Sequence, residues 1–407
     1  NDAALVDAFD AQAAHALGAT PEAAKMRVLS RTGFYNKTVH DPYVNMLRTT
    51  TEAFSAVVGG ADALSVGAFD EVVRPADEFS RRIARNQSLV LSEECELRQV
   101  VDPAGGSYFI ETLTKELAEK SWALFQEIEK QGGIISALKA GFIQQQIAKT
   151  AAARLKKFNQ RRENLVGTNL YPNLAEKPLD APTDILEKVL ARIKEVDANN
   201  AKADVATVEA GFAKATDVPA MLNATKAGAC AFGVFYYTAE NDSNEKAKVT
   251  ALPQGRMAQA YEDLRAASEA YKVKTGKAPA IFLATMGPLR QHKARADFTQ
   301  GFFQAGGFDI IYPKGFDLVD SAVKAAIESG APAVVICSTD DTYPEIVPPL
   351  TKALKAANPK LRVILAGAPA PECEAAYNEA GLDGSISVRS NHFDTLKELL
   401  VSTGVIA

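Results

Sequence analysis

The chain has 407 residues, of which 47% are hydrophobic and 23% charged, with a net charge of −5 at pH 7 and a pI of about 5.6. This length suffices for two or three domains with full-sized cores. The acidic balance offers no basic stripe for nucleic acid and no patch for an anionic membrane. No apolar run approaches the roughly 18 residues that a membrane span needs. We therefore expect no nucleic-acid or membrane partner.

The first residues, NDAALVDAFDAQAAHALG (1–18), have the composition of an amphipathic helix. They carry no initiator Met, no basic n-region and no Arg-rich transit pattern. We expect this helix to begin in the middle of a structure, with further chain upstream.

Strand and helix patterns alternate up to about residue 157. Two strands are predicted, at 26–33 and 63–69. Three helices are predicted, at 41–58, 78–94 and 110–157. The last helix is expected to break at Gly132 and Gly133, with Trp122 and Phe125 on one core-facing side. This order is typical of a β/α barrel or a doubly wound sheet.

Residues 158–276 have a different character, because Ala, Lys, Glu and Asn dominate and no strand pattern repeats. We interpret them as a linker with one or more helices that partly wraps a neighbouring chain. Within it, 227–248 predicts a short hairpin or an exposed loop.

A regular α/β rhythm returns from Lys277 onward. Five strands are predicted, separated by helices of about ten to fifteen residues, at 280–286, 308–313, 333–339, 362–367 and 383–388. Five strands alternating with helices predict a flavodoxin-like, doubly wound domain.

The stretch IFLATMGPLRQHKARADF (281–298) carries the first candidate for chemistry. An apolar strand pattern ends at Gly287, and His292 follows shortly after it. The carboxyl end of a strand is where a parallel sheet holds ligands, and histidine is a common metal ligand.

The four cysteines, at positions 95, 230, 337 and 373, are far apart and form no CxxC pair. We expect reduced thiols in a reducing compartment.

Three segments resemble the adenosylcobalamin-dependent acyl-CoA mutases, specifically the methylmalonyl-CoA mutase family: 41–72, 81–87 and 100–133. The matches are long and collinear. The resemblance implies that 1–172 is the C-terminal part of a (β/α)8 TIM barrel with following helices. It also implies that 173–276 is a helical linker and that 277–407 is a degenerate cobalamin-binding-type flavodoxin domain.

This family contains catalytic chains and a degenerate small chain of a heterodimer. In a catalytic chain, Asp-x-His-x-x-Gly follows the first strand of the cobalamin domain; the His ligates cobalt, the Asp orients it and the Gly leaves room. Here Arg290, His292 and Arg295 occupy these positions. A guanidinium cannot accept the imidazole N–H, and Arg295 places a long side chain in the cofactor's path. We interpret His292 as a solvated histidine at a helix start, with cobalt ligation as the alternative.

Two other turns of the family's cofactor slot keep degenerate candidates. Ser338 lies in CSTDDTYPE (337–345), where Asp340, Asp341 and Tyr343 are added, and Gly367 lies in LAGAPAPE (365–372). Charged, crowded turns favour a closed surface. We interpret Ser338 as a strand-end cap, with a cofactor contact as the alternative. The resemblance thus implies no cofactor-binding residue and no metal ligand in this chain. Only under the alternative would His292 ligate cobalt.

The barrel segments depart from the catalytic pattern as well. Val28 and Ser30 occupy the positions of a His-x-Gln pair that meets the substrate, and 65–67 reads Ser-Val-Gly in place of His-Thr-Asn. Valine cannot donate a hydrogen bond to a substrate carbonyl. Asp70 and Glu71 match acidic residues of the family; we interpret them as a helix N-terminal cap, with acid/base chemistry as the alternative. No catalytic residue is therefore expected.

The resemblance implies the small subunit of a cytoplasmic, heterodimeric methylmalonyl-CoA mutase, an isomerase of propionate metabolism. The catalytic large subunit would bind adenosylcobalamin and the acyl-CoA substrate, and this chain would bind no cofactor. Two alternatives remain: a catalytic acyl-CoA mutase of altered specificity, and a corrinoid-binding module that uses His292. A mitochondrial matrix location would fit the cysteines equally well.

Overall fold

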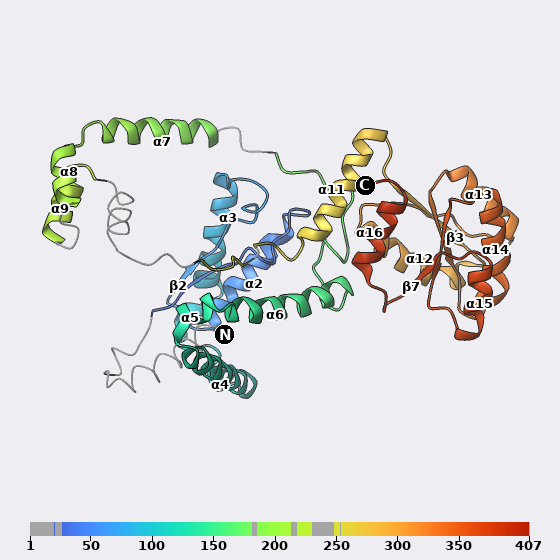
Figure 1. Ribbon diagram of the computed structural model, residues 1–407, viewed down its shortest axis with the longest axis horizontal. Helices are drawn as coiled ribbons and strands as arrows, with labels where there is room; N and C mark the ends of the chain where they lie inside the picture. The colour runs from blue at the N-terminus through green and yellow to red at the C-terminus, as the bar shows by residue number, and fades with distance from the viewer. Residues whose placement is uncertain are drawn as a thin grey trace.

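A computed structural model of the chain describes residue 20 and residues 27–180, 185–212, 218–229, 248–252 and 254–406. The described residues form an N-terminal α/β part, a group of outlying helices and a five-stranded domain at the opposite end (Figure 1). The helix predicted over 1–18 and most of the hairpin or loop predicted over 227–248 lie outside the described residues.

The N-terminal part is built on one strand–helix–strand unit. Strand β1 (Leu29–Arg31) pairs in parallel with β2 (Ala63–Ser65), and helix α2 (Val44–Val58) connects them. Asp77 caps the next helix by accepting a hydrogen bond from the Ser80 N–H at 2.8 Å. That helix and the turns after it are α3 (Glu78–Leu89), a π-helical turn (Val90–Glu94) and a 3-10 turn (Leu97–Gln99).

The expected TIM-barrel architecture is not confirmed. A (β/α)8 barrel closes with eight parallel strands, but the described N-terminal part contains two strands of three residues each. Within the described residues both outer edges of this small sheet are unpaired, so the sheet is open.

The long helix predicted over 110–157 is three helices, because the chain turns at glycines with positive φ. Gly132 (φ 90°) precedes α5 and Gly141 (φ 77°) precedes α6. The helices are α4 (Tyr108–Lys130), α5 (Gly133–Lys139) and α6 (Phe142–Asn159). The rings of Trp122 and Phe125 are stacked, with their centroids 5.5 Å apart, but α4 has no buried residue. The expectation that both rings belong to a core was therefore wrong.

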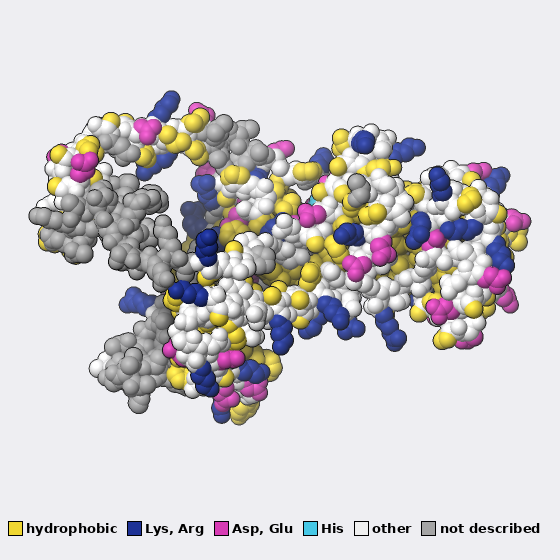
Figure 2. Space-filling model, in the orientation of Figure 1, with side chains coloured by type: hydrophobic (Ala, Val, Ile, Leu, Met, Phe, Trp, Pro, Cys, Tyr) yellow, Lys and Arg dark blue, Asp and Glu magenta, His cyan; other side chains and the backbone are white. Residues whose placement is uncertain are grey.

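Three helices of the predicted linker lie at the margin of the molecule, where Lys188 of the first helix lines a cavity together with residues of α3 (Figure 1). They are α7 (Ile185–Asn200), α8 (Val205–Phe212) and α9 (Val218–Lys226). Apolar side chains are exposed along α7, including Val189, Leu190 and Ile193 at about half of their surface each (Figure 2). None of the helices in the described part of the chain has both the length and the apolar character needed to cross a bilayer.

The C-terminal domain confirms the doubly wound prediction. Five parallel strands lie in the order β4-β3-β5-β6-β7, which is the flavodoxin-like order 2-1-3-4-5. The strands are β3 (Ala280–Thr285), β4 (Asp309–Ile311), β5 (Ala333–Cys337), β6 (Arg362–Ala366) and β7 (Gly384–Ile386).

Alternating strand residues form two separate cores, one on each face of this sheet. Leu283 and Val335 pack with one set of helices, whereas Phe282 and Val334 pack with the other. The first face is covered by α11 (Gln259–Thr275), α12 (Leu289–Gln304) and α16 (His392–Ser402). The second is covered by α13 (Val319–Ser329), α14 (Tyr343–Ala357) and α15 (Pro371–Glu379).

The end of the predicted linker shares the core of this domain. Tyr261 on α11 is buried and packs edge-to-face on Phe158 of α6, with ring centroids 5.2 Å apart. This contact joins the N-terminal part to the sheet domain.

Candidate functional site

The candidate residues of the sheet domain gather where three adjacent parallel strands end. Strands β3, β5 and β6 end at Thr285, Cys337 and Ala366. The turns after β5 and β6 carry Ser338 and Gly367, and His292 lies in the first turn of the helix that follows β3. Ligands of doubly wound folds bind at this carboxyl edge, so the structure brings the candidates to one side of one sheet.

His292 occupies the first turn of α12 and is fully buried, so the prediction of a solvated histidine was wrong. Its Nδ1 lies 2.9 Å from the Gly287 carbonyl oxygen. A carbonyl only accepts, so Nδ1 donates; in the corresponding neutral tautomer the lone pair is on Nε2. Nε2 is buried and has no hydrogen-bond partner among the described residues.

A neighbouring loop closes the space around this imidazole. Gly315 has φ 135°, and a Cβ at this position would lie 2.9 Å from the His292 Cε1 atom. The loop is tied to the strand end by the Phe316 N–H, which donates to the Thr285 carbonyl at 2.8 Å. Arg290, at the position expected to orient the histidine, is exposed.

Ser338 is buried at the end of β5, and its hydroxyl is hydrogen-bonded to other residues of the described chain. Its Oγ donates to the Met286 carbonyl at 3.2 Å and accepts from the Thr342 hydroxyl at 2.8 Å. The Tyr343 hydroxyl accepts from the Ser338 N–H at 3.1 Å and donates to the Ala366 carbonyl at 2.5 Å. Tyr343 thereby links the ends of β5 and β6.

Gly367 adopts φ 152°, and three side chains crowd the position where its Cβ would be. The Tyr343 ring is 3.2 Å away, Asp340 Oδ1 3.3 Å and Arg295 Cζ 3.7 Å. Arg295 forms an ion pair with Asp340, in which the single nitrogen Nη2 lies 2.8 and 2.9 Å from the two carboxylate oxygens. These side chains of the chain itself fill the space beside the glycine, which we call the Tyr343–Arg295–Asp340 plug.

The chemistry available at this edge is limited. Burial raises the pKa of the Cys337 thiol to about 12, which removes it as a nucleophile at neutral pH. In the described ranges no group of three or more His, Cys, Asp or Glu side chains is placed to hold a metal ion.

One of the N-terminal candidates lies beside a cavity of about 380 Å³ between the small sheet and α2. Ser30 lines this cavity with Arg31, Glu52 and Arg154. Val28 has a structural role, because its N–H donates to Asp62 Oδ2 at 2.8 Å. Each charged side chain of the cavity has a counter-charge: Arg31 pairs with Glu71 at 2.9 Å and Arg154 with Glu163 at 2.7 Å.

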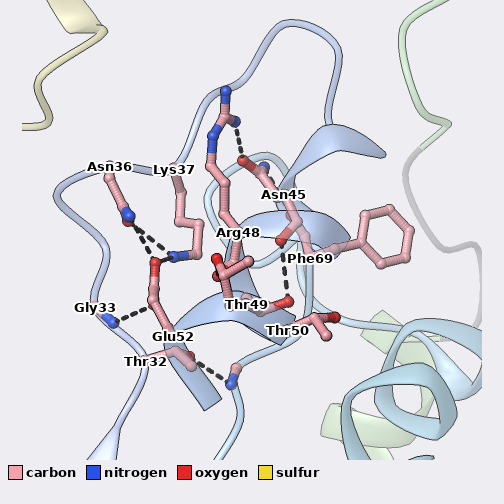
Figure 3. Close-up of polar contacts among 12 residues, drawn as sticks. Thr32, Gly33, Asn36, Lys37, Asn45, Arg48, Thr49, Thr50, Glu52 and Phe69 are labelled. Carbon is pink, nitrogen blue, oxygen red and sulfur yellow. Dashed lines mark hydrogen bonds and ion pairs between the residues drawn. The ribbon is translucent and has the colours of Figure 1, made fainter. Parts of the chain in front are cut away.

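A buried lysine is the main feature of this region that the sequence did not indicate. Lys37 is completely buried, and its Nζ donates to Glu52 Oε1 at 2.5 Å and to Asn36 Oδ1 at 2.8 Å (Figure 3). Glu52 also accepts from Asn36 Nδ2 and from the Gly33 N–H. This ion pair fixes the loop after β1 against α2.

Asn45 makes a second polar connection in the same region (Figure 3). Its amide nitrogen donates to the carbonyls of Thr38 and Phe69, both at 2.9 Å. Its oxygen accepts from the Thr38 N–H and from Arg48 Nη1. Asn45 thus joins α2 to both flanking loops.

The acidic pair after β2 does not cap a helix, so that interpretation was wrong. Asp70 and Glu71 lie in a turn, whereas the following helix begins at Glu78. Asp70 is fully buried and accepts from Arg74 Nε at 2.8 Å. The pair therefore stabilises a turn; Arg82 and Arg85, on α3, are exposed.

The fold and its sites define a two-part α/β chain whose C-terminal domain has the topology of small-ligand-binding doubly wound folds. A family model described as Methylmalonyl-CoA mutase matches residues 8–241. The chain therefore belongs to the methylmalonyl-CoA mutase family, as the sequence segments indicated.

Curated relatives agree with this assignment. The methylmalonyl-CoA mutase small subunit of Porphyromonas gingivalis is 34% identical over 92% of this chain and 51% of its own length. The small subunit of Streptomyces virginiae is 36% identical over 85% of this chain and 46% of its own length. The chain thus spans about half the length of these relatives.

A crystal structure of a cobalamin-binding protein from Desulfitobacterium hafniense DCB-2 is 22% identical and covers 52% of this chain and 98% of its own. Its TM-score is 0.27.

Proposed function

We propose that this chain is the small subunit of a methylmalonyl-CoA mutase and acts as the structural partner of a catalytic large subunit. The complex would interconvert methylmalonyl-CoA and succinyl-CoA. Adenosylcobalamin, bound by the large subunit, would supply the radical chemistry. The names of the curated relatives support the subunit role.

The observation that carries this proposal is the plug at the carboxyl edge of the sheet. Tyr343, Arg295 and Asp340 fill the space beside Gly367, and the Ser338 hydroxyl is already bonded within the protein. His292 is buried under the Gly315 loop. In this arrangement the residues do not fit a corrinoid tail, so we infer that the chain binds no cofactor itself.

The remaining assignments follow from the same proposal. The acyl-CoA substrate would reach this complex through the large subunit, because Val28 and Ser30 offer no His-x-Gln pair. We infer a cytoplasmic location, which the free thiols of Cys337 and Cys373 support.

A second candidate, corrinoid binding through His292, is favoured by one observation. The Nε2 lone pair is buried and unpartnered, and Nδ1 is held by a hydrogen bond, as in a histidine that is ready to ligate a metal. Buried unsatisfied polar groups are uncommon in proteins. Because Nε2 is buried, a ligand could reach it only if the atoms that cover it moved.

Cobalamin retention distinguishes the two candidates. The intact protein is incubated with hydroxocobalamin and gel-filtered, and the visible spectrum of the protein fraction is recorded. We expect no retained corrin absorbance. Stoichiometric retention that is lost in His292→Ala, and kept in the exposed control Arg290→Ala, would overturn the cofactor-free proposal in favour of the second candidate.

A further inference from the structure

A separate cavity lies between the segment after α6 and the sheet domain. Its volume is about 290 Å³, and its lining includes Arg161, Leu170, Phe298, Phe302, Ser387 and Ser390. Phe298 and Phe302 are on α12, and the two serines are in the turn between β7 and α16. The cavity does not include the plug residues or His292.

The guanidinium of Arg161, the cation in this cavity, has no counter-charge among the described residues. Burial lowers the pKa of Arg161, and the groups that act against this effect are the hydroxyls of Tyr261 and Tyr171, with no carboxylate. Its Nη1 is buried without a hydrogen-bond partner. The guanidinium carbon lies 5.8 Å from the centroid of the Phe298 ring. A half-buried arginine remains charged at neutral pH, and desolvating it without a partner is costly.

The backbone at Arg161 has an uncommon conformation. Its φ is 54°, in the left-handed region that non-glycine residues rarely adopt. The Arg161 N–H donates to the Phe158 carbonyl at 3.0 Å, which ends α6. The adjacent Arg162, by contrast, is exposed.

The opposite wall supplies neutral donors. Ser390 Oγ accepts from the Ser387 N–H at 2.9 Å, and its own O–H has no acceptor within the described part of the chain. Ser390 also precedes the N-terminus of α16, where the helix dipole favours negative charge. The rest of the lining consists of the apolar side chains of Leu170, Val388 and the two phenylalanines and of the amides Gln160 and Asn164.

We propose that this cavity binds a small carboxylate with an apolar body, whose carboxylate pairs with Arg161 and whose body lies against Phe298 and Phe302. A single arginine neutralises one negative charge, so a monoanionic carboxylate fits better than a dianionic phosphate. Arginine presents a planar fork that matches a carboxylate. Pockets of about this size with mostly apolar walls and few polar groups are typical small-molecule sites.

Benzoate serves as the probe, and saturation-transfer NMR and thermal shift on the intact protein report its binding. We expect benzoate to bind saturably. Benzamide, its neutral isostere, and inorganic phosphate should not bind. Arg161→Gln should weaken benzoate binding about tenfold or more, since a charge-assisted hydrogen bond is lost. The matched control Arg162→Gln should bind as the wild type does.

Several outcomes would overturn the proposal: no benzoate binding to the wild type, equal binding of benzamide, tighter binding of phosphate, or unchanged affinity in Arg161→Gln. The comparison of benzoate with benzamide uses the wild-type protein, so it decides the question even if the variant does not fold. Failure here leaves the cobalamin-retention result unaffected, because the two sites share no residue.

Discussion

At the scale of single residues, a second buried histidine of the sheet domain has a hydrogen-bond partner for each ring nitrogen. His392 is fully buried; its Nδ1 accepts from the Tyr261 hydroxyl at 3.1 Å, and its Nε2–H donates to the Phe302 carbonyl at 2.7 Å. Burial, together with the charge of Arg161 and against the hydrogen bond to the Phe302 carbonyl, lowers the pKa of His392 to about 3. The neutral ring is therefore part of the native core.

This burial predicts a pH-dependent stability. In the unfolded chain this histidine has a pKa near 6.5 and binds a proton below that pH, whereas the folded histidine stays neutral down to about pH 3. The free energy of unfolding is therefore highest above about pH 6.5 and decreases as the pH falls toward 3. The loss approaches about 1.4 kcal/mol per pH unit. Urea unfolding at pH 7, 6 and 5 measures it. His392→Gln should remove this component of the slope, and Tyr261→Phe should retain it; equal slopes in wild type and His392→Gln would contradict the assignment.

The plug contains one strong and one weak contribution to stability. Tyr343→Phe removes a hydroxyl that joins two strand ends inside the protein and leaves the Ala366 carbonyl and the Ser338 N–H unpaired. We expect a loss of about 1–3 kcal/mol in the free energy of unfolding. Arg295→Ala breaks an ion pair whose side chains are 34% and 67% exposed, which should cost less than about 1 kcal/mol. Chemical denaturation of both variants tests this order, and a larger loss for Arg295→Ala would contradict it.

At the scale of elements, one glutamate joins three distant segments. Glu176 Oε1 accepts from His40 Nδ1 at 2.9 Å and from Arg265 Nη2 at 2.7 Å, and its second oxygen accepts from the Asp41 N–H. Arg265 is on α11, and it also donates to the Asn173 carbonyl at 2.6 Å. The start of the linker is thereby fixed to both parts of the molecule.

Neutralising this glutamate should release the linker segment. In Glu176→Gln the buried Arg265 loses its main counter-charge, so we expect about tenfold or faster amide exchange at Asp41 and around 173–180. Hydrogen-exchange mass spectrometry reads this directly. The control Glu269→Gln removes a carboxylate that is 56% exposed and 3.6 Å from Arg265 Nε, and it should leave exchange unchanged. Equal effects of the two variants would contradict the role of Glu176.

The same contact has a defined acid sensitivity. Burial raises the pKa of Glu176, but the hydrogen bonds from His40 and Asp41 and the charge of Arg265 outweigh this effect and hold it below its usual value of 4.5. Its stabilisation is therefore present above that value and is lost as pH falls through the folded pKa. Protection of 173–180 should decrease below about pH 4.5 in the wild type and should change less in Glu176→Gln.

At the scale of the whole molecule, the two ends bury their apolar surface to different extents. The sheet domain has a dense core on each face, whereas α4 exposes Tyr108 by 92% and Phe109 by 76%. Exposed apolar patches of this kind are typical of surfaces that contact another protein. Under the proposed function, a large mutase subunit would cover part of this surface.

This expectation can be tested by co-purification with a large mutase subunit. The double change Tyr108→Ser and Phe109→Ser should weaken the complex by at least about tenfold, because two aromatic side chains lose burial at the interface. Val273→Ser, at a side chain that is 87% exposed on α11, is the control and should not affect binding. Unchanged affinity in the double variant would place the interface elsewhere.

The sequence by itself determined the type and order of most elements and the family. Strands β3 and β5 are buried on both faces, so each is a continuous apolar run that could be predicted as a strand from local sequence, and the strand–helix order implied the doubly wound sheet. Motif positions such as Arg290 and Arg295 indicated a departure from a cobalt site.

Only the tertiary structure decided which polar groups are buried and what they contact. The local sequence did not indicate that His292 and Lys37 are fully buried, and it wrongly indicated that Trp122 belongs to a core. The partners are far apart in sequence: His40 and Glu176 are separated by 136 residues, and His392 and the Phe302 carbonyl by 90. Local periodicity reports which side of an element faces a core, but the partner of a buried charge is chosen by long-range packing, which no single segment encodes.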